Sequence, residues 1–252
     1  MIVSTGASRA LIAICLVAIL SGCATTGGEP QWDPIEPLNR GVFKFNRTAD
    51  KFVLRPIAKG YQTITPSPIR RGVGNFFYNL ALPIVFVGDL LQAKPQAAGQ
   101  DVVRFLVNST AGIGGLFDVA SRLGIDKNRE DLGQTMAVWG VGNGPYVMVP
   151  FFGPYSLRHG VGTLLDLAFD PLYHYENSSV RDKVWIFKQI DLREGFIGAD
   201  AALDNSLDPY LALRDAYYQN RLGLIHDGDP PLDDEFSEEE FEEFNEEDFL
   251  DQ

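Results

Sequence analysis

Two sets of side chains have the types and spacing that catalysis or metal binding requires. Ser156, His159 and Asp166 would supply the nucleophile, base and orienting acid of a hydrolytic triad. Their closeness in sequence is no evidence for such a triad, because its geometry is defined in space. Asp170 and His174 stand four residues apart, as metal ligands on a helix often do, but a proline separates them and no third ligand pattern follows. Neither set predicts an active centre or a metal site.

The motifs of three common enzyme classes are missing from the sequence. There is no Gly-x-Ser-x-Gly, the turn that presents the nucleophile of many hydrolases. No Gly-Lys pair occurs, which excludes a Walker A phosphate loop. The glycine clusters at 72–74, 112–115 and 140–144 do not complete the dinucleotide-binding pattern Gly-x-Gly-x-x-Gly. We therefore expect no enzymatic activity and no cofactor.

The N-terminus carries a different chemistry, in the segment Leu20-Ser21-Gly22-Cys23. The uncharged apolar run before it, residues 10–20, is too short to cross a bilayer core of roughly 30 Å and has the layout of a secretory signal. A pair of small residues directly before a cysteine is typical of the lipobox of bacterial lipoproteins. We expect residues 1–22 to be removed and Cys23 to carry the lipid. An ordinary signal peptide with a chance cysteine is the alternative.

The acidity of the chain is concentrated at its end. The formal net charge is −13, but 14 of the 34 acidic residues lie within residues 227–252, where there is no Lys or Arg. The body therefore has 20 acidic residues against all 21 basic ones and is nearly neutral. The tail, residues 226–252, also places phenylalanines among glutamates. Such a segment is either disordered and solvated or an amphipathic helix that docks on a basic partner.

A basic amphipathic helix is predicted to open the body. Residues 23–32 read as a flexible tether, and Asp33-Pro34-Ile35-Glu36 resembles a capping box at a helix start. Apolar residues then recur at steps of three and four, and Pro56 stops or kinks the helix. A cationic stripe points the opposite way and either faces solvent or attracts an anionic membrane surface. The stripe consists of Arg40, Lys44, Arg47, Lys51 and Arg55.

The middle of the body consists of apolar blocks interrupted by Gly and Pro. Residues 72–93 carry a single charge, and Pro83 is expected to divide them into two short pieces. Residues 132–157 carry no charge at all but hold five glycines and three prolines, which excludes a straight helix. Non-helical backbone sits at membrane depth only where protein buries it or where it lines a water-filled cavity. This stretch is therefore either the core of a soluble domain or the border of a passage.

Two more conventional helices are expected near the end of the body. One begins near Ser179 and runs to about residue 194, and another begins at Asp208-Pro209 and runs to residue 222. No sustained apolar and polar alternation predicts a strand. The body, residues 33–225, is therefore predicted to be all-α with long broken segments.

Ordered blocks along this body resemble the MlaA (VacJ) family of outer-membrane lipoproteins. The resemblance covers residues 33–222 and is more specific than any single motif. Its blocks are Asp33-Pro34, Asn39-Arg40, Phe45-Asn46, Pro66-x-Pro68-x-Arg70, Asn75-Phe76, Arg104-Phe105, Asn108, Gly114-Gly115-Leu116-Phe117-Asp118-Val119-Ala120, Gly133-Gln134-Thr135, Trp139-Gly140-Val141-Gly142-x-Gly144-Pro145-Tyr146, Leu157-Arg158, Ser206-x-Asp208-Pro209-Tyr210 and Arg214-x-Ala216-Tyr217.

The resemblance implies a fold, a location and partners. It implies an α-helical, ring-like body in the inner leaflet of the outer membrane, around an amphipathic channel. Such a body takes phospholipids mislocalised to the outer leaflet and passes them to a periplasmic lipid carrier of the Mla system, which maintains lipid asymmetry. It also implies association with trimeric porins, and no role for nucleic acid. The acidic tail has no counterpart in the family pattern.

Residue chemistry and resemblance lead to one hypothesis about the site. Moving a phospholipid requires no covalent step, only a route that keeps the head group wet and the chains in apolar surroundings, since each exposed CH₂ costs about 0.8 kcal/mol. We expect Gly140, Gly142, Gly144, Pro145 and Tyr146 to form a loop that controls this passage, and the basic stripe to face head groups or a partner. The alternatives are an adaptor lipoprotein that organises porins without conducting lipid and, third, a lipid-acting enzyme.

Overall fold

The computed structural model describes residues 32–231. The predicted signal peptide, Cys23, the tether before residue 32 and the tail from residue 232 lie outside the described residues. Helices dominate the described chain, as predicted. In order, its elements are α2 (Glu36–Ala49), the π-helical turn η1 (Asp50–Leu54), α3 (Arg55–Ile64), α4 (Ser67–Leu91), α5 (Pro95–Thr110), α6 (Val119–Arg122), α7 (Leu132–Val138), β1 (Tyr146–Val149), β2 (Gly153–Ser156), α8 (Leu157–Asp166), α9 (Ser178–Gly195), the 3₁₀ turn η2 (Ile197–Ala199), α10 (Asp200–Asp204) and α11 (Pro209–Ile225).

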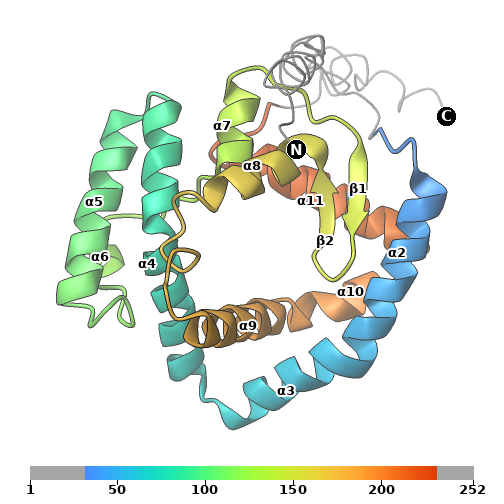
Figure 1. The fold of residues 1–252 in the computed structure, drawn as a ribbon, viewed down its shortest axis with the longest axis horizontal. Coiled ribbons are helices and arrows are strands. Elements are labelled where there is room, and N and C mark those ends of the chain that lie inside the picture. Colours follow the sequence, from blue (N-terminus) through green and yellow to red (C-terminus); the bar gives the residue numbers. More distant parts are fainter. Residues whose placement is uncertain (1–31, 232–252) are drawn as a thin grey trace, which may run out of the picture.

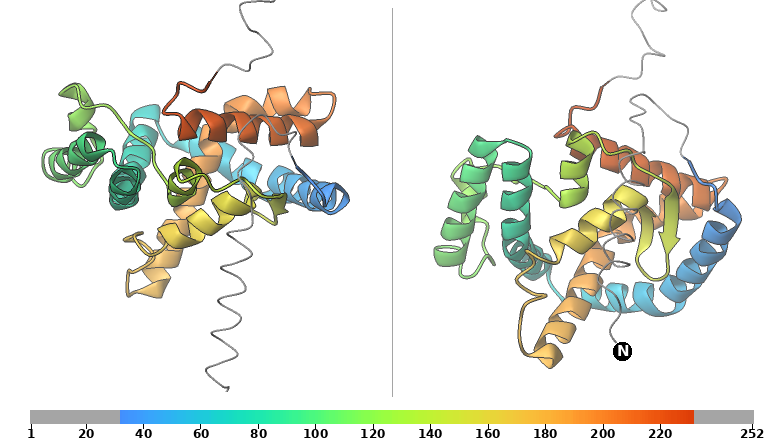
Figure 2. Two further views of the ribbon diagram at one scale, coloured as in Figure 1. Left: turned by 90° about the horizontal axis from the view of Figure 1, so that it is seen from above. Right: turned by 45° about the horizontal axis from the view of Figure 1, so that its top comes forward.

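The helices form a ring, as the resemblance implies (Figure 1). Helices α2 and α3 make one continuous arc, α4 forms the opposite side, and α7, α8 and α11 complete the circuit. Helix α9 crosses beside α3 and α4, while α5 lies outside the ring against α4, and α6 lies beside α5. Seen from above, α10 and α11 lie on one side of the level of α2, α4 and α5, and the first half of α9 extends to the other side (Figure 2).

A two-stranded hairpin inside the helical body was not predicted. Strands β1 and β2 pair antiparallel, with Tyr146 opposite Ser156 and Val149 opposite Gly153. Each strand has only four residues, too few for the alternation of apolar and polar residues to be recognised in the sequence. In addition, β2 contains glycine and proline, which are rare in strands. The body is therefore all-α except for one hairpin, which points into the ring (Figure 1).

Two predicted helix boundaries, at Asp33-Pro34 and at Pro83, were wrong, and of the two outcomes expected at Pro56 the helix stop does not occur. Pro83 lies inside the continuous 25-residue α4 and does not divide it. Among the described residues, α4 is the one helix that is long and apolar enough to cross a bilayer, by length and composition alone. The first helix begins at Glu36 with Pro37 in its first turn, so Asp33 is not its N-cap. Pro56 does not stop the helix, because the π-helical turn before it accommodates the missing N–H and the chain continues as α3.

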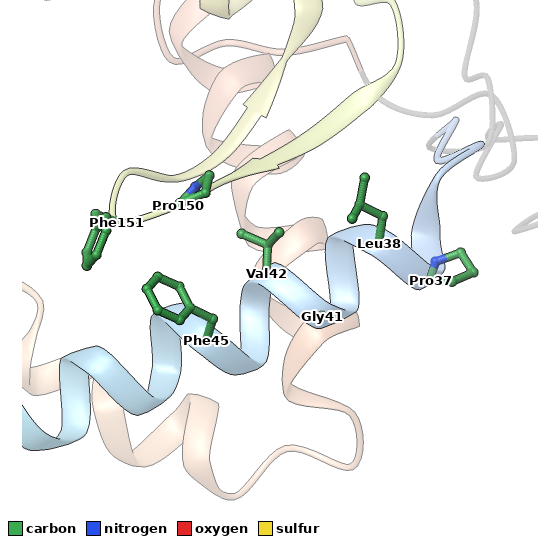
Figure 3. Close-up of a pocket in the computed structure, with 7 residues that line it drawn as sticks. All are labelled: Pro37, Leu38, Gly41, Val42, Phe45, Pro150 and Phe151. Carbon is green, nitrogen blue, oxygen red and sulfur yellow. The ribbon is translucent and has the colours of Figure 1, made fainter.

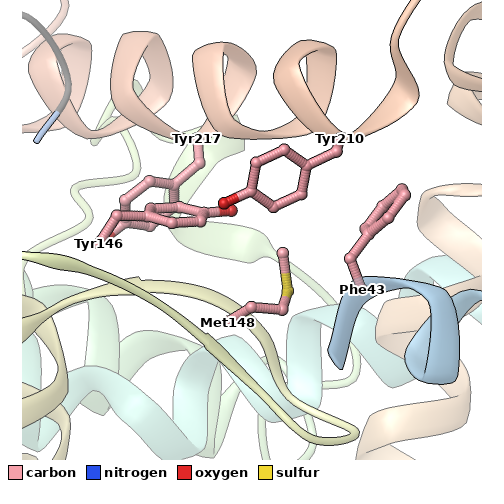
Figure 4. Packing of buried hydrophobic residues seen from close by; sticks show 5 residues of the cluster. All are labelled: Phe43, Tyr146, Met148, Tyr210 and Tyr217. Atoms are coloured by element: carbon pink, nitrogen blue, oxygen red, sulfur yellow. The ribbon is translucent and has the colours of Figure 1, made fainter. Parts of the chain in front are cut away.

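The interior of this fold is unusually polar and its exterior unusually apolar. The main hydrophobic cluster is aromatic and lies between β1, α2 and α11 (Figure 4). It consists of Phe43, Tyr146, Met148, Tyr210 and Tyr217. Almost as many polar or charged side chains are buried as hydrophobic ones, while many large hydrophobic side chains are exposed on nearly every helix. Such exposure of apolar surface marks a membrane or protein contact.

The contact between α4 and α5 buries two carboxyl groups. Asp89 and Asp101 are both fully buried, and Asp89 accepts a hydrogen bond from Asn128 Nδ2 at 2.7 Å. Burial, with the neighbouring Asp89 carboxylate, raises the pKa of Asp101 to about 8. The raised pKa favours the protonated form of Asp101, which reduces the repulsion between the two carboxyl groups.

Candidate functional site

The glycine-rich segment 139–145 joins α7 to β1, and two of its glycines have a conformation that other residues rarely adopt. Gly140 has φ +85° and Gly144 has φ +65°, both in the left-handed region. A Cβ at Gly144 would also lie 3.0 Å from the side chain of Leu157. Gly142 has no positive φ, and a Cβ at this position would meet no atom within 4 Å, so open space surrounds it. The segment therefore needs glycine at 140 and 144 for its backbone, whereas position 142 is free of that constraint.

The start of α8 holds this loop in place. Arg158 donates from Nη1 to the carbonyl of Val141 at 2.6 Å and from its backbone N–H to the carbonyl of Asn143 at 3.1 Å. The N–H of Leu157 donates to the carbonyl of Pro145 at 3.1 Å. Three backbone carbonyls of the loop are thus anchored to α8. These hydrogen bonds hold the backbone of the loop in a fixed position beside α8.

Tyr146 does not belong to this loop, which corrects the sequence-based assignment. It is the first residue of β1 and is fully buried in the aromatic cluster (Figure 4). Its ring centroid lies about 6 Å from those of Tyr210, Tyr217 and Tyr218. Burial raises the pKa of its hydroxyl. Aromatic neighbours bury Tyr146 completely, so its side chain supports the hairpin from the core.

Two asparagines of α2 hold the hairpin against that helix. Asn39 donates from Nδ2 to the carbonyl of Tyr146 at 3.0 Å and accepts from the N–H of Met148 at 2.9 Å. Asn46 donates to the carbonyl of Val149 at 2.9 Å and accepts from the N–H of Phe151 at 2.7 Å. The spacing matches, because seven helical residues rise about 10.5 Å and three extended residues span about 10 Å. The amides take the place of a third strand and satisfy the free edge of β1.

The tip of the hairpin is apolar and contacts two sides of the ring. Phe151 has φ +65°, is 66% exposed and packs edge-on against Phe45 of α2, with centroids 5.1 Å apart. Phe152 lies 6.1 Å from Trp185 of α9. A groove of about 450 Å³ runs between α2 and the tip (Figure 3). Its lining is entirely apolar apart from the backbone: Pro37, Leu38, Gly41, Val42, Phe45, Pro150 and Phe151.

Three arginines of the basic stripe pair with acidic residues near α10 and α11. Arg40 contacts Asp208 at 2.8 Å and Arg47 contacts Asp204 at 2.8 Å. Arg55 lies 3.0 Å from Asp204, and its hydrogen bond lowers the pKa of that carboxyl. These ion pairs fasten the arc of α2 and α3 to the last helices of the chain. Asp200, Asp204 and Asp208 recur at steps of four in the sequence, a signal that could have predicted the pairing.

Lys44 and Lys51 differ from the arginines of the stripe. Both are exposed, and neither makes an ion pair with any described residue. Lys51 lies 5.9 Å from the ring centroid of Phe52, itself 72% exposed. The stripe therefore divides into three structural arginines and two lysines that remain available to head groups or a partner.

The residues with catalytic or metal-binding spacing have structural roles. Ser156 caps α8 by accepting from the N–H of His159, and burial lowers the pKa of His159 to about 4. The ring of His159 lies 3.1 Å from the hydroxyl of Tyr217, and Asp166 accepts from the N–H of Leu132 at 3.0 Å. No hydrolytic triad is assembled from these three residues. His174 contacts a backbone carbonyl, and no group of three metal-ligating side chains occurs in residues 32–231.

The asparagine contacts lead to a stability prediction. Replacing Asn46 by Ala removes both bonds to the hairpin tip, and we expect faster amide hydrogen exchange at Phe151 at a cost of about 1–3 kcal/mol in local stability. Asn39→Ala should accelerate exchange at Met148 instead. Exchange followed by mass spectrometry in detergent measures both. Asn143→Ala is the control, since its side chain is exposed. Unchanged exchange at Phe151 in Asn46→Ala would show that the amide does not hold the tip.

Comparison with known proteins gives the family. A family model described as MlaA lipoprotein matches residues 31–223. The chain is 34% identical over 217 residues to the intermembrane phospholipid transport system lipoprotein MlaA of Escherichia coli K12, covering 84% of this chain and 86% of that protein. Its counterpart of the same name from Haemophilus influenzae is 31% identical over 227 residues, covering 86% and 90%. An uncharacterized protein of Rickettsia prowazekii is 37% identical over 198 residues, covering 77% and 78%.

A solved structure agrees with the sequence comparisons. It is described by the words "Structural basis for maintenance of bacterial outer membrane lipid asymmetry" and is 34% identical to this chain. The two superpose with a TM-score of 0.69, over 77% of this chain and 98% of the other. The helical ring, the family model and these relatives all indicate the same family. The chain belongs to the MlaA lipoprotein family.

Proposed function

We propose that this chain removes phospholipids mislocalised to the outer leaflet of the outer membrane and passes them on for retrograde transport, which maintains lipid asymmetry. The observation that carries the proposal is a helical ring that exposes many large apolar side chains and buries many polar ones, in a chain that matches an intermembrane phospholipid transport lipoprotein over most of its length. The exposed apolar side chains suit hydrocarbon surroundings, where their exposure costs nothing. A transfer of this kind needs no catalytic group.

Location and partners extend the proposal. Cys23 anchors the chain in the periplasmic leaflet of the outer membrane, and a soluble carrier of the Mla system receives the lipid. Trimeric porins associate with the outside of the ring. The unpartnered apolar side chains of α5 support a partner there, because Val102, Val103, Phe105 and Leu106 are exposed on a helix that lies outside the circuit (Figure 1). The same observation favours the second candidate function, an adaptor that organises porins without conducting lipid.

The lipid route follows the hairpin and the loop before it. Gly140, Gly142, Gly144 and Pro145 form its fixed border, and Phe151 and Phe152 at the tip give the acyl chains an apolar contact. Lys44 and Lys51 lie on the same arc as the apolar groove and offer charges to head-group phosphates. Tyr146 supports this arrangement from the core.

Filling the open space at Gly142 tests the border. Gly142→Leu should fold normally, because a side chain there meets no neighbour, and should reduce phospholipid transfer to acceptor carrier several-fold by narrowing the route. Gly198→Leu, at an equally open position in η2, is the matched control. Transfer is followed with fluorescent phospholipid between proteoliposomes and the carrier. If Gly142→Leu transfers phospholipid at the wild-type rate, the loop does not border the lipid route.

Charge reversal separates the two parts of the basic stripe. Lys44→Glu with Lys51→Glu should leave the melting temperature unchanged but weaken binding to vesicles containing phosphatidylglycerol, by about 1 kcal/mol for each cation lost. Arg47→Glu should instead lower the melting temperature, because it places two acids together at Asp204. Vesicle co-sedimentation and thermal unfolding measure these effects. If the double lysine variant retains both vesicle binding and porin association, these lysines contact neither head groups nor the porin.

A further inference from the structure

A second hollow, of about 440 Å³, lies where the start of α4 meets the end of α9. Its volume is within the range of small-molecule sites, about 300–1,000 Å³. Three arginines, two acids and two exposed apolar side chains line it. Unlike the groove beside α2, it therefore combines charge with apolar surface.

The two acids of this hollow already have partners. Glu194 contacts Arg70 Nε at 3.1 Å and accepts from Gln62 at 2.8 Å. Asp191 accepts from the hydroxyl of Tyr61 at 2.9 Å. Arg70 also donates to two backbone carbonyls before α4. One arginine and both acids thus form a satisfied structural set that joins α3, α4 and α9.

The other two arginines, Arg71 and Arg129, have no such partners. Neither makes an ion pair or a side-chain hydrogen bond with any described residue, whereas most arginines in residues 32–231 do. Arg122 is the third arginine of this kind, and it lies outside the hollow. The hollow is lined by three guanidinium groups and only two carboxylates, so it has a positive charge in excess and favours an anion.

The position of Arg129 is set by its neighbours. The backbone of Asn128 exchanges hydrogen bonds with the hydroxyl of Tyr78, at 2.8 and 3.1 Å. Gln134 donates to the carbonyl of Arg129 itself at 3.1 Å. The loop before α7 is therefore fastened to α4 on one side of Arg129 and to α7 on the other. The guanidinium is presented to the hollow by an ordered backbone, which lowers the entropic cost of binding.

We propose that this hollow binds the phosphate group of a phospholipid, and the inference rests on the proposed function. Arg71 and Arg129 donate to the phosphate oxygens, which guanidinium groups match in geometry and charge. Leu192 and Phe196, 49% and 65% exposed, lie on the same hollow and contact the hydrocarbon next to the head group. A ligand with one anionic end and one apolar end satisfies both features.

Binding of phosphatidylglycerol to the full-length protein in detergent tests the assignment by native mass spectrometry. Arg71→Gln with Arg129→Gln should raise the lipid concentration for half-occupancy about tenfold, since two charge-assisted donors are lost. Arg122→Gln, the matched control, should bind as wild type does. The melting temperature should stay unchanged in both, because no described residue loses a partner. Restoring charge with Arg71→Lys and Arg129→Lys should recover part of the affinity.

The remaining outcomes separate this site from the transport function. If the double glutamine variant binds phosphatidylglycerol like wild type, the head-group site is wrong and the transport proposal stands. If millimolar inorganic phosphate displaces the lipid and occupies the same arginines alone, the hollow is a free-phosphate site. If the wild-type protein takes up no phospholipid at all, the proposed function itself fails.

Discussion

The closure of the ring depends on a buried carboxylate. Asp33, whose side chain is 2% exposed, accepts from Asn39 at 2.7 Å and from the hydroxyl of Tyr210, and it lies 3.4 Å from Arg214. These contacts join the first described helix to the last, across about 180 residues of chain. Removing one partner of a buried charge costs about 3–5 kcal/mol, because the remaining charge is uncompensated. The ion pair between Arg40 of α2 and Asp208, the N-cap of α11, joins the same two helices a second time.

The surroundings of the ring explain why so many polar side chains are buried in its core. In the membrane setting proposed here, the ring gains little from burying apolar side chains, because the hydrocarbon outside is as apolar as a core would be. Specific hydrogen bonds and ion pairs therefore determine which elements meet. Arg104 binds Asp118 at 2.9 Å to hold the turn after α5, and Arg221 binds Asp131 to hold α7 against α11. The apolar side chains are left for the surface, where Phe151 and Phe45 meet at the tip of the hairpin.

The sequence predicted the helical body and its family but not how its parts connect. Asp208-Pro209 as a helix start was confirmed, because capping is local and the side chain of Asp208 accepts from the N–H groups of Tyr210 and Leu211. Pro83 misled the prediction because neighbouring helices stabilise α4 around the missing hydrogen bond. Tyr146 misled it because a tyrosine after glycines reads as a loop, while its burial depends on tyrosines more than 60 residues away. Long-range packing of this kind leaves no periodic signal.

The central claim is that phospholipid passes the hairpin tip. A photo-crosslinking residue at Phe151, which is exposed at the tip, tests it most directly in the lipidated protein in its native membrane. We expect phospholipid adducts at Phe151, identified by mass spectrometry, and none from the same residue placed at the exposed position Glu176. Abundant porin adducts with no phospholipid at Phe151 would contradict the claim and favour the adaptor function.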